Sequence, residues 1–312
     1  MKIAILGASG HIGASLADEL SKRSGLDLVL FSRRPSASLL TGPAAETRVS
    51  QRAVSDLDFS GCDIVINAIG LGAPDKIAAA GADILGLTFE WEEKIKAALR
   101  EAPECLYVFI SSGAIYGRLD QKPASSDSVA EFSVNEAEIG SGYAKAKFVA
   151  EALHRSWRHN RILDVRIFGY ASQFIDLRST FFLSQIYRAL LEDTVFVTGP
   201  QDMVRDYVGA KELLSLVESV ARRAQVNDAV DVFSLAPVNK FSIIDAMQQF
   251  GLKCEVVDDA ERAIAPARVQ YFTSFMRARE YGYRPQRSSL DIVVETAKHF
   301  FCSTKRDHWD NK

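Results

Sequence analysis

The sequence predicts an α/β protein built on a doubly wound parallel sheet, with a second, smaller α/β domain. Three observations lead to this class. Short apolar runs alternate with helical stretches through the first half, glycines cluster after the first run, and the alternation breaks up after about residue 168. Apolar strands that alternate with helices indicate parallel pairing, because each crossover helix must pack back onto the sheet.

The strands of this sheet are expected where apolar runs are bounded by Gly, Asp or polar residues. Helical stretches such as "IGASLADELSKRS" and "FEWEEKIKAALREA" lie between these runs. Their order along the chain is that of a doubly wound nucleotide-binding fold. The expected strands are residues 2–6, 27–31, 63–69, 106–111 and 163–168.

The second half begins with helical stretches in "STFFLSQIYRALLED" and "GAKELLSLVESVARR", followed by a returning strand in "AVDVFSLA". A further helix is expected to begin with a cap at Ser242, three residues before Asp245, and to end at Gly251. The sequence closes with a turn, a helix and a charged end that we expect to fray. The expected division is a dinucleotide-binding domain of residues 1–168 and about 205–236, a substrate-binding domain of about 169–204 and 237–302, and a tail of 303–312.

The bulk composition is that of an ordinary globular protein, with 312 residues, 47% hydrophobic and 25% charged. The formal charge of −3 gives no electrostatic argument for nucleic acid or an anionic membrane as the main partner. No stretch approaches the roughly 20 apolar residues of a membrane span. The cysteines are far apart and without metal-ligand spacing, so we expect free thiols in a reducing cytoplasm and no metal site. They are Cys62, Cys105, Cys254 and Cys302.

Three glycines at a spacing of three follow the first expected strand, in "ILGASGHIGASLADEL". Gly7 permits a tight turn, Gly10 lets the main chain approach a pyrophosphate, and Gly13 lets the next helix pack close to the sheet. The helix amino terminus then offers free N–H groups and partial positive charge to phosphates. The spacing is G-x-x-G-x-x-G, which also occurs in plain strand–helix connections, but its place after the first strand predicts dinucleotide binding. Ser9, His11 and Ile12 are further cofactor-binding candidates in this turn.

The end of the second expected strand decides between the two nicotinamide dinucleotides. An NAD site usually has an acid there, which accepts hydrogen bonds from the adenosine ribose. Here Ser32 stands at that point and Arg33 follows it. A serine can donate to a 2′-phosphate and an arginine can pair with it, so the sequence favours NADP over NAD. Asp56, with Leu57 beside it, is a candidate for contacting the adenine, although an acid in a surface loop is the commoner meaning.

A serine, a tyrosine and a lysine form the candidate reaction centre. Tyr143 and Lys147 are four residues apart and share a helix face, and Ser112 follows the fourth core strand. A nearby ammonium and an oxidised nicotinamide favour the phenolate of a tyrosine that titrates near ~10 in water. Tyr143 can then exchange a proton with a substrate alcohol or carbonyl while hydride moves to or from the nicotinamide. Ser112 would hold the same oxygen, and Lys147 would also fix the nicotinamide ribose.

At these motifs the chain resembles the extended short-chain dehydrogenase/reductase family, in its branch of nucleotide-sugar epimerases, dehydratases and reductases. The resemblance covers nearly the whole length: "GASGHIG", "NAIG", "SSGAIYG" and "YAKAK" match the cofactor-binding (Rossmann) domain, and "RIFGYAS", "VRDYV" and "REYGYRPQRSSL" match later motifs. It implies catalysis by Ser112, Tyr143 and Lys147, and a homodimer formed through the Tyr143 helix and the helix before it. It also implies that the "NAIG" segment binds cofactor, through Ala68, Ile69 and Gly70.

The same resemblance suggests how a nucleotide sugar is held. Arg205, in "VRDYV", is the candidate for gripping the diphosphate, a role that suits a forked guanidinium. Arg268 is a second, looser candidate. Gln173, Arg178 and Ser179 lie where the small domain would meet the sugar, and Tyr116 is expected to pack near the site. Aromatic residues that either line a base pocket or belong to the core are Phe181, Phe182, Tyr187 and Phe196.

Two further observations narrow the chemistry. Gly113 and Ala114 stand where the 4,6-dehydratases of the family carry Asp-Glu, and neither can move a proton, which argues against dehydration. Apart from His11, the histidines fall on helices or in the tail without partners at metal-ligand spacing, so no chemistry is assigned to them. They are His154, His159, His299 and His308.

Three hypotheses on function remain from the sequence. The first is an NADPH-dependent reductase of a nucleoside-diphosphate 4-keto-6-deoxysugar, which agrees with Ser32 and Arg33. The second is a 4-epimerase that keeps its nicotinamide bound, and the third is a non-catalytic dinucleotide sensor, against which the retained Tyr143 counts. A reductase of carbonyls without a nucleotide is a further possibility.

Overall fold

The computed structural model describes residues 1–33, 44–70, 84–117, 119, 122–131, 139–157, 161–258 and 269–309. The side chains of residues 139–141 and 301–309 lie outside this description. So do two residues singled out from the sequence, Arg268 and His159, and the side chains of Cys302 and His308.

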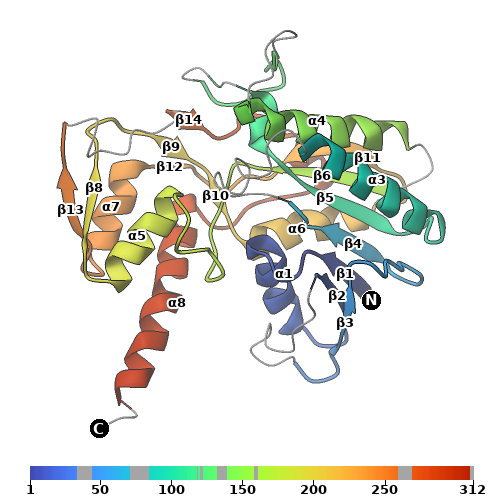
Figure 1. The fold of residues 1–312 in the computed structure, drawn as a ribbon, viewed down its shortest axis with the longest axis horizontal. Helices are drawn as coiled ribbons and strands as arrows, with labels where there is room; N and C mark the ends of the chain where they lie inside the picture. The colour runs from blue at the N-terminus through green and yellow to red at the C-terminus, as the bar shows by residue number, and fades with distance from the viewer. Residues whose placement is uncertain are drawn as a thin grey trace.

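A seven-stranded parallel sheet forms the centre of the larger part of the molecule (Figure 1). Its order is β11–β6–β5–β4–β1–β2–β3, so the chain starts in the middle, builds one edge and then returns to build the other. The doubly wound class expected from the sequence is therefore confirmed. The strands are β1 Lys2–Leu6, β2 Asp27–Ser32, β3 Arg48–Ala53, β4 Ile64–Asn67, β5 Leu106–Ser112, β6 Arg161–Ile167 and β11 Asn227–Asp231.

Helices cover both faces of this sheet (Figure 1). On one face α1 (His11–Ser21) and α6 (Ala210–Ala221) pack against the strands, and Leu16 of α1 lies in that core fully buried. On the other face lie α3 (Ile84–Arg100) and α4 (Ile139–Ser156), with Ile95 of α3 fully buried against the sheet. The apolar runs of the central strands are thus explained by burial on both sides.

A second core lies beside the sheet, among α5 (Phe182–Leu191), α7 (Lys240–Gln248) and α8 (Ser289–Trp309). Tyr187 and Phe196 are buried in it, so these two aromatic residues belong to the core. Short strands border this part. The strand β8 Val195–Thr198 pairs with β13 Lys253–Val256, and β7 Gly169–Tyr170 pairs with β10 Tyr207–Val208. The strand β9 Val204–Arg205 lies between β12 Val238–Asn239 and β14 Gln270–Tyr271.

The structure corrects three expectations about elements. The edge strand β3 was not expected, because its sequence, "RVSQRA", is polar and its residues are exposed or half-buried. The expected cap at Ser242 is wrong: α7 begins at Lys240, and the Asn239 side chain caps it by accepting from the Ser242 amide at 2.7 Å. The helix α8 continues to Trp309, where the sequence predicted a frayed tail.

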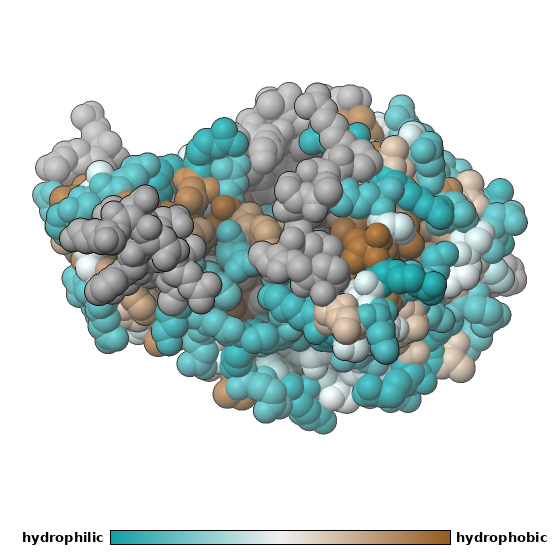
Figure 2. Space-filling view, turned by 90° about the horizontal axis from the view of Figure 1, so that it is seen from below, coloured by the Kyte–Doolittle hydropathy of each residue, from teal (hydrophilic) through white to brown (hydrophobic). Residues whose placement is uncertain are grey.

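Hydrophilic side chains cover most of the face that is seen from below, with apolar residues gathered in small patches (Figure 2). Within the described part of the chain, no helix is long and apolar enough to cross a membrane.

Candidate active site

The glycine turn lies at the point where the strand order reverses, between β1 and β4. Gly7 has φ +75°, and a Cβ there would lie 3.0 Å from the carbonyl group of Ala68. A Cβ on Gly13 would lie 2.2 Å from the Gly7 oxygen, so α1 packs against the turn too closely for any side chain. Gly10 is the N-cap of α1, without a side-chain cap and without an acid in the first turn. This helix end is therefore open to an anion, as a pyrophosphate requires.

An unsatisfied hydroxyl stands at the end of the neighbouring strand. The Ser32 Oγ is buried and has no hydrogen-bond partner among the described residues. A buried hydroxyl without a partner is costly, and an oxygen of a bound ribose or phosphate would satisfy it. Arg33 follows and is exposed, Asp56 is exposed in the loop after β3, and Leu57 packs against the core.

The segment after β4 is fixed by a buried amide. Asn67 accepts from the Ile69 amide at 3.0 Å and donates to the Tyr107 hydroxyl at 2.8 Å. Gly70 at the end of this segment is exposed, and a Cβ there would lie 3.6 Å from the Lys147 Nζ. Residues 68–70 thus run from the glycine turn to Lys147. The open helix end, the orphaned Ser32 hydroxyl and this path together fit a dinucleotide.

His11, a cofactor-binding candidate in the glycine turn, is partly buried. Its imidazole packs edge-on against Tyr170, with ring centroids 5.2 Å apart, and its Nε2 is buried without a partner in the described part of the chain. Burial lowers the pKa of His11 to about 4, so the ring is neutral at pH 7. It can offer a phosphate one hydrogen bond and no charge.

Ser112, Tyr143 and Lys147 meet at the carboxyl end of β5. The Ser112 hydroxyl caps the short helix η3 (Gly113–Tyr116) by accepting from the Ala114 amide at 3.2 Å, and it is hydrogen-bonded to the Tyr143 side chain. Lys147 donates to the Ile110 carbonyl at 2.7 Å, and its Nζ lies 5.9 Å from the centre of the Tyr143 ring. The motif spacing predicted this grouping.

The electrostatics of the pair differ from expectation in one respect. Burial, with a contribution from Tyr271, raises the pKa of Tyr143 to about 12, against the hydrogen bond from Ser112. Burial also lowers the pKa of Lys147 to about 8. In the protein alone, Lys147 does not lower the pKa of Tyr143. Its ammonium donates to the Ile110 carbonyl instead. Tyr143 is therefore a protonated acid.

An aromatic wall fills the space beside the serine. A Cβ on Gly113 would lie 2.6 Å from the ring of Phe168, which stacks on Tyr116 and contacts Tyr271. There is no room for a carboxylate at position 113. The expectation that Tyr116 packs near the site is consistent with this stacking, and its hydroxyl lies 3.0 Å from both carboxylate oxygens of Asp231.

Arg205 and Tyr271 lie side by side in register on β9 and β14. The guanidinium is 5.8 Å from the centre of the Tyr271 ring, and its Nη1 donates to the Val204 carbonyl at 2.9 Å. Tyr271 also acts on the pKa of Tyr143, so it lies near both Arg205 and the reaction centre. No sequence signal singled out Tyr271 or Phe168, since both enter the site only through tertiary packing.

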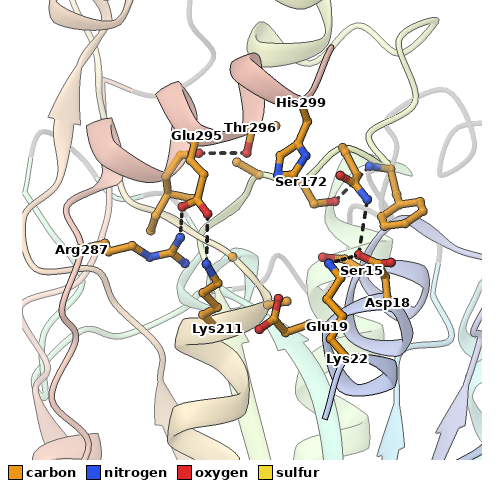
Figure 3. A pocket seen from close by; sticks show the side chains of 16 residues that line it. Ser15, Asp18, Glu19, Lys22, Ser172, Lys211, Arg287, Glu295, Thr296 and His299 are labelled. Atoms are coloured by element: carbon orange, nitrogen blue, oxygen red, sulfur yellow. Dashed lines mark hydrogen bonds and ion pairs between the residues drawn. The ribbon is translucent and has the colours of Figure 1, made fainter. Parts of the chain in front are cut away.

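Three other substrate candidates are not brought to the triad. Gln173 lines a groove between α1, α6 and α8, where its Nε2 is 3.4 Å from an oxygen of Asp18. Figure 3 shows this groove, with Asp18 of α1 and Lys211 of α6 on its walls. None of the triad residues lines this groove, and charged side chains around it pair with one another, as Lys211 does with Glu295 at 3.0 Å. Arg178 is exposed and contacts Asp176 at 3.4 Å, and the buried Ser179 accepts from the Phe181 amide at 3.3 Å.

Among the described residues, no group of three or more His, Cys, Asp or Glu side chains is arranged to hold a metal ion.

Comparisons with known proteins agree with this fold. Residues 3–236 match the model of the NAD dependent epimerase/dehydratase family. The fold is similar to UDP-N-acetylglucosamine 4-epimerase from Methanobrevibacter ruminantium, at TM-score 0.76 and 17% identity, over 97% of this chain and 98% of that one. A comparison with curated proteins finds no match.

Two further solved structures share the fold. One is UDP-glucuronic acid 4-epimerase from Bacillus cereus in complex with UDP-glucuronic acid and NAD, at TM-score 0.69 and 15% identity, over 96% of this chain and 100% of that one. The other is dTDP-glucose 4,6-dehydratase from Bacillus anthracis in complex with NAD, at TM-score 0.72 and 13% identity, over 99% and 98%.

Proposed function

The chain belongs to the NAD dependent epimerase/dehydratase family, as an enzyme of the extended short-chain dehydrogenase/reductase type, and we propose that it is an NADPH-dependent reductase of a nucleoside-diphosphate 4-keto-6-deoxysugar. The observation that carries this proposal is the Tyr143 hydroxyl, which is bonded to Ser112 and stays protonated because burial raises its pKa to about 12. Reduction of a carbonyl needs an acid that supplies a proton to the oxygen as hydride reaches the carbon.

In this mechanism Tyr143 gives its proton to the carbonyl oxygen of the sugar, and Ser112 holds the same oxygen by a hydrogen bond. A nicotinamide dinucleotide, when bound, supplies the hydride. Lys147 is anchored on the Ile110 carbonyl and its Nζ lies near Gly70, which suits it to orient the nicotinamide ribose.

The dinucleotide is held by the three regions that fit it. The glycine turn and the amino terminus of α1 receive the pyrophosphate. Ser32 and Arg33 receive a 2′-phosphate, which supports NADP as the cofactor, because β2 ends without the acid typical of NAD sites. The residues that we assign to the cofactor are Gly7, Ser9, Gly10, His11, Ile12, Gly13, Ser32, Arg33, Asp56, Leu57, Ala68, Ile69 and Gly70.

The nucleotide-sugar substrate extends from Arg205 toward the reaction centre. Arg205 binds the diphosphate, and the sugar passes Tyr271 to reach Tyr143. Arg268 remains a second candidate for the diphosphate. Gln173 and Arg178 have no part in this proposal, because their side chains contact Asp18 and Asp176.

Dehydration is disfavoured, because Phe168 occupies the room that a catalytic acid at position 113 would need. A nucleotide-sugar 4-epimerase is the second candidate, favoured by the likeness to 4-epimerase structures that contain NAD. Both reactions use the same three residues, but an epimerase returns the hydride to its substrate and consumes no cofactor.

The test is turnover of a panel of nucleoside-diphosphate 4-ketosugars with NADPH or NADH. The reductase consumes one NADPH for each sugar reduced, whereas interconversion without net consumption establishes the epimerase. The variant Arg205→Ala should raise the KM for nucleotide sugars about tenfold or more, since it removes a bidentate contact to phosphate. An unchanged KM would point to carbonyl substrates without a nucleotide.

We further propose a cytoplasmic homodimer that associates through α3 and α4. Three large apolar side chains on these helices are well exposed: Leu87 at 40%, Phe89 at 46% and Phe148 at 49%. Exposed apolar groups on two neighbouring helices are typical of an interface between subunits. The free thiols of Cys62, Cys105 and Cys254 suit a reducing compartment.

A further inference from the structure

His154, to which the sequence assigned no chemistry, lies at the centre of a buried ionic group beneath α4. Its Nδ1 is 2.6 Å from Oδ1 of Asp164 on β6, and its Nε2 is 2.8 Å from Oε2 of Glu92 on α3. The Asp164 carboxylate also accepts from Arg155 at 2.7 Å. All the side-chain atoms of His154 are buried, so it ties α3, α4 and β6 together without touching solvent.

This histidine shares its surroundings with the catalytic lysine. Lys147 and His154 are seven residues apart, which is two turns of α4 and about 10 Å along its axis. Both contact the ring of Phe109: the Lys147 Nζ is 4.2 Å from its centre, and the imidazole meets it edge-on with centroids 5.1 Å apart. The charges of Glu92 and Asp164 also act on Lys147, where they oppose the effect of burial on its pKa.

The charges of the group balance only when His154 is an imidazolium. Burial lowers the pKa of His154, but the charges and hydrogen bonds of Asp164 and Glu92 outweigh burial and raise it to about 9. The ring is therefore charged at neutral pH. The two carboxylates of the group, Glu92 and Asp164, are then matched by the two cations His154 and Arg155.

A neutral side chain at position 154 would leave this interior with one uncompensated carboxylate, which is strongly unfavourable. The neighbouring cations are held in place: Arg166 binds Glu151 through both carboxylate oxygens, and Arg155 is already on Asp164. Lys147 has a long, flexible stem, and among the described residues its ammonium has one hydrogen-bond partner, the Ile110 carbonyl. Its ammonium is the cation that an unpaired carboxylate behind Phe109 would attract.

We propose that His154 is a positioning residue for catalysis: its imidazolium satisfies Glu92 and Asp164, so that the Lys147 ammonium stays on the Ile110 carbonyl beside Tyr143. The inference rests on the proposed function, in which Lys147 orients the cofactor ribose. His154 acts through Lys147, since it is enclosed by α3, α4 and the sheet. Tyr107, whose ring centre lies 5.4 Å from the centre of the imidazole, is the remaining titratable group that faces it from β5.

The kinetic test compares His154→Gln, Glu92→Gln and the double variant with wild type. His154→Gln should lower kcat about tenfold, a change typical of coupled ionic neighbours, while the KM for the nucleotide sugar stays within about threefold. Adding Glu92→Gln removes the unpaired carboxylate and should bring kcat back to within about threefold of wild type. His299→Gln is the matched control and should leave kcat unchanged, because His299 is an exposed residue of α8 that lines the groove away from the triad.

A second measurement needs neither cofactor nor substrate. Because the folded pKa of His154 lies above its unfolded value of about 6.5, its contribution to stability is fully present below pH 6.5 and is lost as the pH rises through 9. The Tm of wild type should therefore fall more steeply from pH 6.5 to 9 than that of His154→Gln. If that variant does not fold, Glu92→Gln alone should move the loss of stability to lower pH.

The outcomes separate this inference from the proposed function. A double variant no more active than His154→Gln, or a His154→Gln enzyme with wild-type kcat, overturns the positioning role, because a merely structural histidine is not rescued by deleting a charge. A wild-type enzyme inactive on every nucleotide sugar overturns the proposed function. In that event, a pH dependence of Tm that is the same in wild type and variants overturns the charged state of His154 as well.

Discussion

At the scale of single residues, Tyr143 and Lys147 share a helix face but differ in what burial does to each. Burial disfavours the charged form of any group, so it raises the pKa of the phenol and lowers that of the ammonium. The sequence identified both residues and Ser112 from their order and spacing. It could not supply their charge states, because the carbonyl of Ile110 and the ring of Phe109 reach Lys147 only in the folded protein.

The variant Tyr143→Phe keeps the aromatic ring and removes the proton donor. We expect kcat to fall by about 10²- to 10⁴-fold, the usual contribution of a general acid, with the Kd of the nucleotide sugar within about threefold of wild type. Steady-state kinetics and calorimetry measure the two quantities. Tyr281→Phe is the control, since that hydroxyl donates to Asp228, away from the site. A Tyr143→Phe enzyme with more than a tenth of the wild-type kcat would rule out the assigned role.

The variant Lys147→Met should be inactive yet more stable than wild type at pH 7. The folded pKa of Lys147 lies below its unfolded value of 10.5, so the cost of its buried charge is fully present below pH 8 and is relieved as the pH rises toward 10.5. When the lost hydrogen bond to the Ile110 carbonyl is subtracted, we expect a net gain of roughly 1 to 2 kcal/mol in the free energy of unfolding at pH 7. Urea unfolding at pH 7 and pH 10 should show this gain shrinking, and a less stable variant at pH 7 would contradict the argument.

At the scale of elements, the clearest sequence signals were the strands buried on both faces and the glycine turn. The edge strand β3 escaped prediction because half-exposed residues leave no apolar run. The start of α7 was misplaced because both Asn239 and Ser242 can cap a helix, and only the backbone decides which oxygen reaches which amide. The partners of His154 come from α3 and β6, far apart in the chain, and no local pattern could bring them together.

Two glycines of the turn should respond differently to alanine. In Gly13→Ala the new Cβ would lie 2.2 Å from the Gly7 oxygen, so the helix must move, whereas in Gly10→Ala the same contact is 3.3 Å. We expect Gly13→Ala to lower the free energy of unfolding by roughly 2 kcal/mol or more and Gly10→Ala by less than about 1 kcal/mol. Urea unfolding measures both.

The same two alanine variants also test cofactor binding. Both variants should bind NADPH at least about tenfold more weakly, because each Cβ intrudes where the main chain and the pyrophosphate approach each other. Fluorescence titration with NADPH measures this affinity. Wild-type affinity in Gly10→Ala would show that the phosphates do not rest on this turn.

At the scale of the whole molecule, the sheet and the second core meet around the site: Ser112, Tyr143 and Lys147 come from the sheet side, and Arg205 and Tyr271 come from the small strands of the other part. The motifs predicted the first group fully. Of the second group they predicted only Arg205, because Tyr271 is defined by its register with β9. The aromatic wall around Phe168 likewise depends on how the two parts pack.

The assembly prediction concerns the exposed apolar side chains of α3 and α4. The variant Phe148→Glu places a charge in the proposed interface and should convert a dimer into a monomer, as measured by light scattering coupled to size-exclusion chromatography. Phe181→Glu is the control, because Phe181 is similarly exposed, at 44%, at the start of α5. A wild-type monomer, or a Phe148→Glu dimer of unchanged stability, would exclude this interface.

The most direct test of the central claim follows hydride from the cofactor into the sugar. NADPH that carries deuterium at both hydrogen positions of nicotinamide C4 is incubated with the enzyme and a nucleoside-diphosphate 4-keto-6-deoxysugar, and the product is analysed by mass spectrometry. We predict one deuterium in each product sugar with wild type and none with Tyr143→Phe. An unlabelled sugar for every ketosugar offered, or equal labelling by the Tyr143→Phe enzyme, would contradict hydride transfer assisted by Tyr143.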